Sequence, residues 1–135
     1  MSGDLLPLRL EPGVDLRRTL EAVPSAHRCE AAFVLSGIGS LRAASLRFAG
    51  QPGPHRLEGD LELLTLAGSI APDGAHLHMS VADAAGAVSG GHVGYDCIVR
   101  TTAEVLIALL PAWSFARQAD PRTGYAELAI VRREG

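Results

Sequence analysis

Three of the five histidines in this chain fall within residues 74–94, at positions 76, 78 and 92. On a β-strand, side chains two residues apart point to the same face, so His76 and His78 would have Cα atoms roughly 6.5 Å apart and could share one metal ion. Three neutral imidazoles suit zinc or a similar divalent transition metal, and they leave a fourth tetrahedral position open for water or a small ligand. The alternative is that the histidines only form hydrogen bonds within a packed hairpin or across a subunit contact.

The turn between the histidines decides whether His92 joins the other two. Residues 83–86, Asp-Ala-Ala-Gly, suit a type I turn followed by a left-handed glycine. This turn predicts that His78 lies opposite His92, with all three imidazoles on one face. A loop one residue longer would pair His78 with Gly91 and would send His92 to the other face. The first register also gives a common apolar face to Leu77, Met79, Val81 and Val93.

The segments that must position this hairpin are mostly typical of β-strands. One helix is expected from Asp15, its N-cap, to about Ala22, with Pro24 limiting its far end. Strands are expected over residues 5–11, 29–41, 42–49, 57–70, 97–110 and 127–132. We therefore expect an α+β fold: a single compact domain over residues 1–135, with a mainly antiparallel β-sheet and one principal helix near the N-terminus.

Several local features refine this expectation. Pro7 indicates an edge position for the first strand. The continuous apolar run at 29–41 predicts a strand covered on both faces. Residues 111–120 are expected to form a loop that holds Trp113 and Phe115, either as a lid on the core or as an anchor between subunits. The two cysteines are expected to be reduced core thiols.

Glu104 is the one carboxylate within the apolar run at 97–110. It can be an outward-facing group on a half-exposed strand. Alternatively, it is a candidate catalytic residue, offering a general base or orienting one of the histidines. The sequence alone assigns no reaction.

Charge and composition exclude some functions. The net charge is −3, and the twelve basic residues, all arginine, are scattered along the chain. Binding to nucleic acid mainly through phosphate contacts needs a concentrated basic surface, which this pattern does not predict. No apolar run is long enough to cross a membrane, and no basic segment followed by an apolar stretch opens the chain, so we expect a cytoplasmic protein without membrane contact.

Taken together, several motifs resemble the plant and prokaryote conserved (PPC) domain, also called the AT-hook-associated DNA-binding-like domain. They are Gly-Ile-Gly-Ser at 37–40, Leu-Ala-Gly at 66–68, His-Leu-His-Met-Ser at 76–80, Gly-Gly-His at 90–92, Ile-Val-Arg-Thr-Thr-Ala-Glu-Val at 98–105 and Thr-Gly-Tyr-Ala-Glu-Leu at 123–128. The chain looks like a stand-alone prokaryotic type, since it contains no AT-hook.

The resemblance implies a compact domain that assembles as a homotrimer. It also implies that His76, His78 and His92 match the positions at which prokaryotic members are suspected of binding a metal. We therefore expect a homotrimer with a metal site and a small-ligand or regulatory role. The alternative is a DNA-associated regulatory protein that binds nucleic acid or partner proteins, with arginines such as Arg42, Arg47 and Arg56 gathered by trimerisation.

Overall fold

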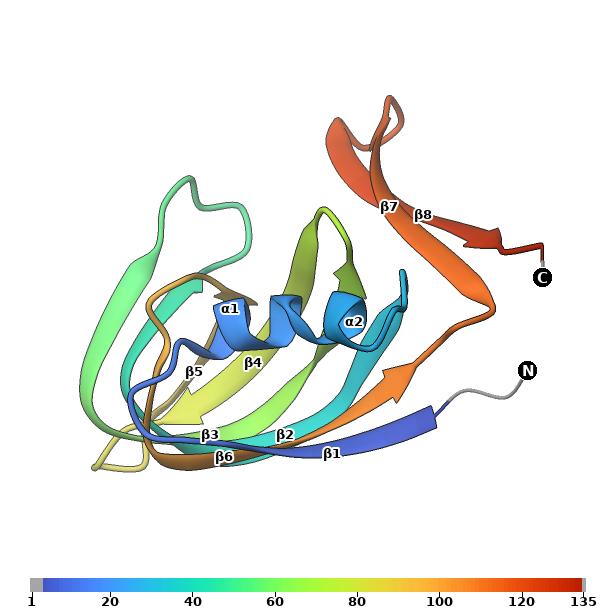
Figure 1. Ribbon diagram of the computed structural model, residues 1–135. Coiled ribbons are helices and arrows are strands. Elements are labelled where there is room, and N and C mark those ends of the chain that lie inside the picture. Colours follow the sequence, from blue (N-terminus) through green and yellow to red (C-terminus); the bar gives the residue numbers. More distant parts are fainter. Residues whose placement is uncertain (1–3, 135) are drawn as a thin grey trace.

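A computed structural model describes residues 4–134, which contain eight strands and two short helices (Figure 1). The elements are β1 (Asp4–Leu10), α1 (Leu16–Glu21), α2 (Val23–Ala26), β2 (Ala32–Arg47), β3 (His55–Ala71), β4 (Gly74–Ala82), β5 (Val88–Val93), β6 (Ile98–Leu109), β7 (Trp113–Asp120) and β8 (Tyr125–Arg132). The predicted α+β class, with antiparallel sheets and a helical segment near the N-terminus, is confirmed.

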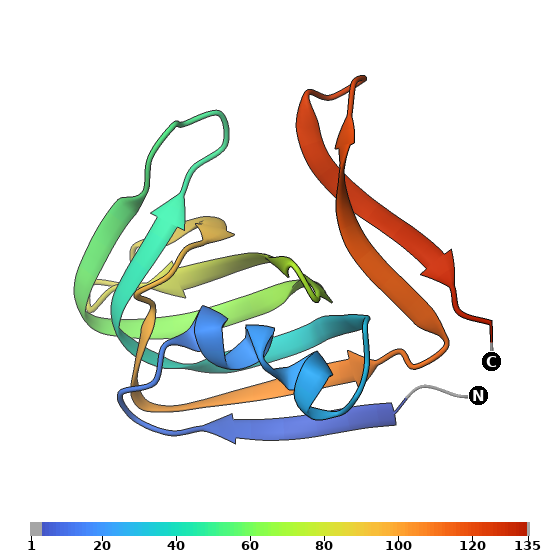
Figure 2. The same cartoon turned by 45° about the horizontal axis from the view of Figure 1, so that its top comes forward.

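Six strands form one antiparallel sheet in the order β1-β6-β2-β3-β4-β5, so β1 lies at an edge as Pro7 indicated. The end of β2 also pairs with β5, through Leu46 with Val93 and Arg47 with His92. Strands β2, β3, β4 and β5 therefore form a closed set, because β5 pairs with β2 as well as with β4. The remaining strands, β7 and β8, form a separate two-stranded sheet that stands away from the first (Figures 1 and 2). We call this β7–β8 hairpin, residues 113–132, the arm.

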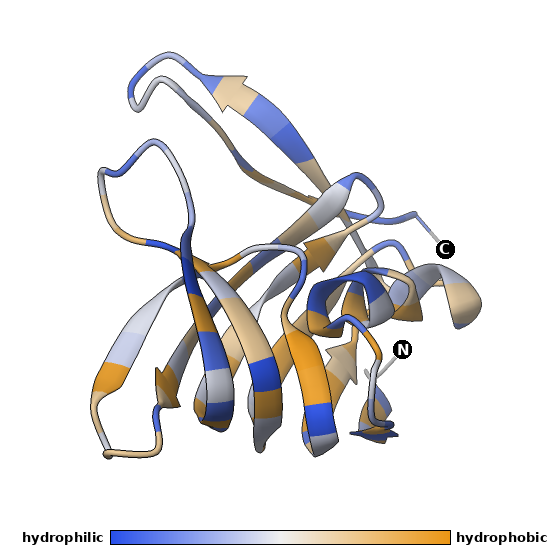
Figure 3. Ribbon diagram, turned by 90° about the vertical axis from the view of Figure 1, so that its left-hand side faces the viewer, coloured by the Kyte–Doolittle hydropathy of each residue, from blue (hydrophilic) through white to orange (hydrophobic). Residues whose placement is uncertain are grey.

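The core lies between the curved sheet and α1. Asp15 caps α1 as predicted by accepting a hydrogen bond from the backbone N–H of Arg18 at 3.0 Å. Leu16 and Leu20, one helical turn apart, are fully buried. On the sheet, apolar and polar residues alternate along the strands (Figure 3), which lets one face pack against the helix. Pro24 does not end the helical region: it lies in the first turn of α2, where its missing N–H is not needed.

The two strands predicted over 29–41 and 42–49 are one strand, β2. Register shifts near Gly39 and between Leu41 and Ala43 let it continue past irregular positions, and these bulges interrupt the alternation from which strands are predicted. The prediction of cover on both faces is wrong for a single chain, because Leu35 and Ile38 are 50% and 51% exposed. The outer face of the sheet is thus apolar and open in places.

Residues 111–120 do not form the predicted loop. Trp113 and Phe115 lie in β7, which pairs with β8 along its whole length. Phe115 is only 3% exposed and packs edge to face against Phe33, with ring centroids 5.6 Å apart. This contact anchors the root of the arm to the main sheet. The pairing was missed because it depends on β8, whose predicted extent began two residues too late.

Two smaller expectations concern the cysteines and the membrane. Cys29 and Cys97 are free and buried, as predicted. Within residues 4–134, none of the helices has the length and apolar character required to span a bilayer.

Candidate metal centre

The hairpin of β4 and β5 has the register that the turn predicted. His78 pairs with His92 and Met79 pairs with Gly91. In the turn, the Asp83 N–H donates to the Ala87 carbonyl at 2.9 Å, and the Gly86 N–H donates to the Asp83 carbonyl at 2.9 Å. Gly86 has a φ of 81°, the left-handed conformation that a glycine adopts without strain.

This register gathers the three histidines. One ring nitrogen from each of His76, His78 and His92 lies within 4.8 Å of the others. The ring centroids are 4.9 Å apart for His76 and His78, 4.6 Å for His78 and His92, and 5.5 Å for His76 and His92. Within residues 4–134, no side-chain hydrogen bond involves these rings, so the alternative in which they only support a packed hairpin lacks its hydrogen bonds.

The three imidazoles fit a tetrahedral metal ion. Two nitrogens bound to zinc at about 2.0–2.1 Å are roughly 3.4 Å apart. The rings of His76 and His78 are exposed, and that of His92 is half-buried, so small changes in side-chain torsions can bring the nitrogens to this separation. All three donors are nitrogen, the ligand type that zinc, copper, nickel and iron accept.

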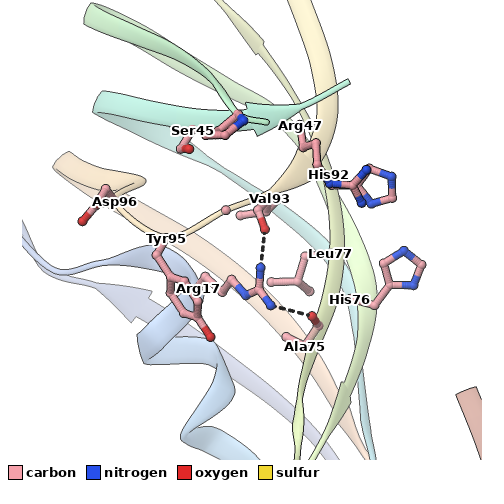
Figure 4. A pocket seen from close by; sticks show the side chains of 12 residues that line it. Arg17, Ser45, Arg47, Ala75, His76, Leu77, His92, Val93, Tyr95 and Asp96 are labelled. Atoms are coloured by element: carbon pink, nitrogen blue, oxygen red, sulfur yellow. Dashed lines mark hydrogen bonds between the residues drawn. The ribbon is translucent and has the colours of Figure 1, made fainter. Parts of the chain in front are cut away.

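An arginine from α1 holds the ends of the two histidine strands together. Arg17 Nη1 donates to the Val93 carbonyl at 2.9 Å, and Nη2 donates to the Ala75 carbonyl at 3.2 Å (Figure 4). Its Nε donates to Glu21 at 3.2 Å, and Glu21 also accepts from the Ala75 N–H at 3.0 Å. Arg17 lies on the core side of the strands, whereas His76 and His92 point to the opposite side. It is therefore a positioning residue, which sequence reasoning missed.

The histidine face borders a pocket of about 520 Å³ beneath the arm. Arg47 is the register partner of His92 on β2. Arg117, on the arm, donates from Nη2 to Ser69 Oγ at 3.0 Å, and Ser69 is in turn the register partner of His76. The polar side chains that line this pocket are Arg47, His76, His92, Arg117, Tyr125 and Glu127.

The structure does not bring Glu104 to the histidines of the same chain. Glu104 is exposed on the outer face of β6, where it pairs with Arg9 and Ile38 and lines a different pocket. The carboxylate that lines the histidine pocket is instead Glu127 on β8. Glu127 lies in the motif at 123–128 and Arg47 is among the arginines considered for DNA, but no local signal places them or Arg117 beside the histidines, since each reaches the site through pairing or packing with distant segments.

Two of the histidines favour the neutral form. Partial desolvation of the ring lowers the pKa of His76, and the neighbouring Arg117 guanidinium and the other two imidazoles lower it further. Burial also lowers the pKa of His92, followed by the effect of Arg47 and of His78. A lowered pKa means that the neutral ring, which is the metal-binding form, persists to lower pH than for a free imidazole at about 6.5.

Arg117 and Arg47 should lower the pKa values of different histidines, Arg117 that of His76 and Arg47 that of His92. In the metal-free protein, Arg117→Gln is expected to raise the pKa of His76 towards its ordinary value, because the variant removes a nearby positive charge. Arg47→Gln should do the same for His92 and act less on His76. An NMR titration of the imidazole signals measures both shifts. Equal shifts of both rings in both variants would contradict this arrangement.

Residues 1–111 match the family described as the Plants and Prokaryotes Conserved (PCC) domain, the PPC family of the sequence resemblance. The arm lies outside the matched region. Among curated proteins, the chain is 51% identical over 126 residues to a protein named Bifunctional protein GlmU from Synechococcus sp. (strain JA-2-3B'a(2-13)). The match covers 93% of this chain but only 20% of that protein, so the chain spans about a fifth of the length of the relative.

Two solved structures are similar over nearly the whole chain, arm included. A hypothetical protein from Salmonella cholerae-suis has a TM-score of 0.94 at 38% identity, covering 99% of this chain and 98% of that one. A metal-containing protein from Archaeoglobus fulgidus has a TM-score of 0.78 at 28% identity, covering 96% and 95%.

Proposed function

The chain belongs to the Plants and Prokaryotes Conserved (PCC) domain family, and we propose that it is a metal-binding member that acts as a homotrimer in a small-ligand or regulatory role. In this proposal His76, His78 and His92 are the ligands of zinc or a similar divalent transition metal. The observation that carries it is the convergence of three imidazole nitrogens within 4.8 Å on one face of a hairpin. The similar Archaeoglobus protein, described as metal-containing, supports it.

The residues of this chain define what such a site can do. Three histidine ligands leave one tetrahedral position open, which distinguishes the site from a closed structural zinc site. A bound metal would supply a Lewis acid or an acidic water at that position. The chain itself contributes neutral imidazoles, and it places Arg47, Arg117 and Glu127 around them. We assign no reaction, and Glu104 has no part in the site of its own chain.

Elemental analysis tests the proposal. Untagged protein, purified without chelator and offered zinc, should carry about one metal ion per chain. The ion should be released at a pH below that at which a free imidazole titrates, about 6.5, because the pKa values of His76 and His92 are lowered and protonated imidazole cannot ligate a metal. A chain that takes up no stoichiometric metal at neutral pH, with zinc in excess, would refute the metal site.

Exposed apolar side chains on the outer face of the main sheet support the homotrimer. Leu35 and Ile38 on β2 and Leu64 on β3 are 50%, 51% and 43% exposed. Leu35 and Leu64 also line a shallow pocket together with His78, so this apolar surface is continuous with the histidine face. Apolar surface of this kind gains stability when a second copy of the chain covers it.

A charge on this surface should disrupt the assembly. Ile38→Arg is expected to shift the protein from trimer to monomer, because burying a guanidinium in the contact carries a large desolvation cost even when Glu104, its neighbour across the strands, pairs with it. Ala84→Arg, which adds the same charge at the exposed hairpin turn, is the matched control and should leave the assembly intact. Sedimentation analysis measures both. An Ile38→Arg protein that remains trimeric would show that the contact between subunits lies on another surface of the chain.

The DNA-associated alternative has less support from the charges. Arg56 pairs with Glu58 at 2.9 Å, and Arg100 lies 3.8 Å from both Asp60 and Glu62. These pairs neutralise two of the arginines that could contact a phosphate backbone, and the chain as a whole carries a net charge of −3. We therefore propose the histidine site, and not a DNA-binding surface, as the functional site.

A further inference from the structure

Among the residues that the structure describes, two arginines beside the histidines have no carboxylate partner and line the histidine pocket. Within residues 4–134, five arginines form no ion pair with a carboxylate, at positions 28, 42, 47, 117 and 132, and of these five Arg47 and Arg117 are the two that line the histidine pocket. The Arg47 side chain donates one hydrogen bond to the Gln51 carbonyl at 3.4 Å, and the Arg117 side chain donates one to Ser69 Oγ at 3.0 Å. A guanidinium has five N–H donors, so both retain donors for a ligand.

These two arginines approach the histidines from opposite sides. Arg47 is on β2, next to His92 across the strand pair. Arg117 is on the arm, tied to the neighbour of His76 and held by a second hydrogen bond from its backbone N–H to Asp73 at 3.1 Å. Both line the same pocket of about 520 Å³, which lies in the size range of small-molecule sites.

We propose that this pocket binds a small ligand with an oxyanion group, a carboxylate or a phosphate, held by Arg47 and Arg117 beside the histidine-bound metal. This inference rests on the proposed metal site, because the oxyanion would take the open position on the ion. Two guanidinium groups outweigh the one carboxylate in the pocket, Glu127, and a divalent ion adds to the positive charge. Arginine forks match carboxylate and phosphate oxygens with paired hydrogen bonds.

The arm then determines which ligands the protein accepts. It lies beyond the region matched by the family, residues 1–111, yet it supplies Arg117, Tyr125 and Glu127 to the pocket. Tyr125 is largely exposed and also borders a second hollow, formed with Arg47 and residues 50–52, that extends the pocket outward. A ligand longer than its oxyanion group can occupy this extension.

Calorimetric titration of the zinc-loaded protein with acetate and with inorganic phosphate tests the inference, with acetamide as the uncharged probe. We expect saturable binding of at least one anion and none of acetamide. The tighter anion identifies the ligand as a carboxylate or a phosphate compound. Arg47→Gln and Arg117→Gln should each weaken anion binding about 10-fold or more, as loss of a charge-assisted hydrogen bond does. Glu127→Gln should strengthen it, because the variant removes a repelling charge.

Arg122→Gln is the matched control, since Arg122 pairs with Asp120 at the tip of the arm and should not affect binding. Metal content is measured on each sample. If the protein has full metal content but binds no anion, or if its anion affinity is unchanged in both Arg47→Gln and Arg117→Gln, this inference is overturned. The proposed metal site is not affected by that result. Arginine-dependent anion binding by a protein that takes up no metal supports the anion pocket and rejects the metal site.

Discussion

Replacing His78 with alanine should abolish stoichiometric metal binding. The three ring centroids form a compact triangle, in which His78 is 4.9 Å from His76 and 4.6 Å from His92, and these two are 5.5 Å apart. Two imidazoles that remain on one face cannot hold a tetrahedral ion with comparable strength. Loss of an outer-shell partner costs a metal site up to about 100-fold in affinity, so loss of a direct ligand should cost at least about that much. Competition with a chromogenic chelator measures the change.

The same variant should leave the fold intact. The His78 ring is exposed on the face opposite the buried Leu77 and Met79, and surface substitutions of this kind change stability by about 0.5 kcal/mol or less. In the wild type, added zinc should raise the melting temperature by mass action, and in His78→Ala this rise should disappear. His27→Ala, at an exposed position after α2, is the control and should keep both the metal and the rise. Undiminished affinity in His78→Ala would mean that the ion binds elsewhere.

The centre of the site was predictable because its determinants are local. The alternation of side chains, the turn at 83–86 and one register decision place His78 opposite His92, and all three lie within 21 residues of sequence. The capping of α1 by Asp15 and the edge position of β1 are local in the same sense. The turn, the helix cap and the edge strand each depend on a residue type, such as Gly, Asp or Pro, that strongly favours that structural position.

The surroundings of the site were not predictable because they depend on distant contacts. Arg47 reaches His92 only because the end of β2 pairs with β5 as well as with β3. Arg117 reaches His76 only because the arm, misassigned in part as a loop, folds back onto Ser69. Glu104 stood out in the sequence as a carboxylate in an apolar run, but its strand lies on the far side of β2 from the hairpin. The clustering of the three histidines therefore follows from local sequence, whereas the residues that surround them can be placed only from the tertiary structure.

The largest effect on stability is expected from Gly68→Ala. Gly68 lies on β3 opposite Leu77 of the histidine strand and has a φ of +153°, a conformation that other residues rarely adopt. A Cβ there would overlap the backbone carbonyl of His76 and would lie 2.8 Å from the Leu77 Cα. Neither backbone group can move without separating β3 from β4. Backbone strain and overpacking each cost about 1–3 kcal/mol, so the free energy of unfolding should fall by about 3 kcal/mol or more.

Gly53→Ala provides the matched control for this prediction. No atom lies within 4 Å of the added Cβ at Gly53, and the backbone there has no positive φ, so its effect should stay within about 0.5 kcal/mol. Urea unfolding of the metal-free proteins measures both variants without a contribution from bound zinc. Because the clash falls on the backbone of His76, a proposed metal ligand, Gly68→Ala should also weaken zinc binding in whatever fraction remains folded. Equal midpoints for the two variants would show that β3 and β4 separate at this position more easily than their pairing implies.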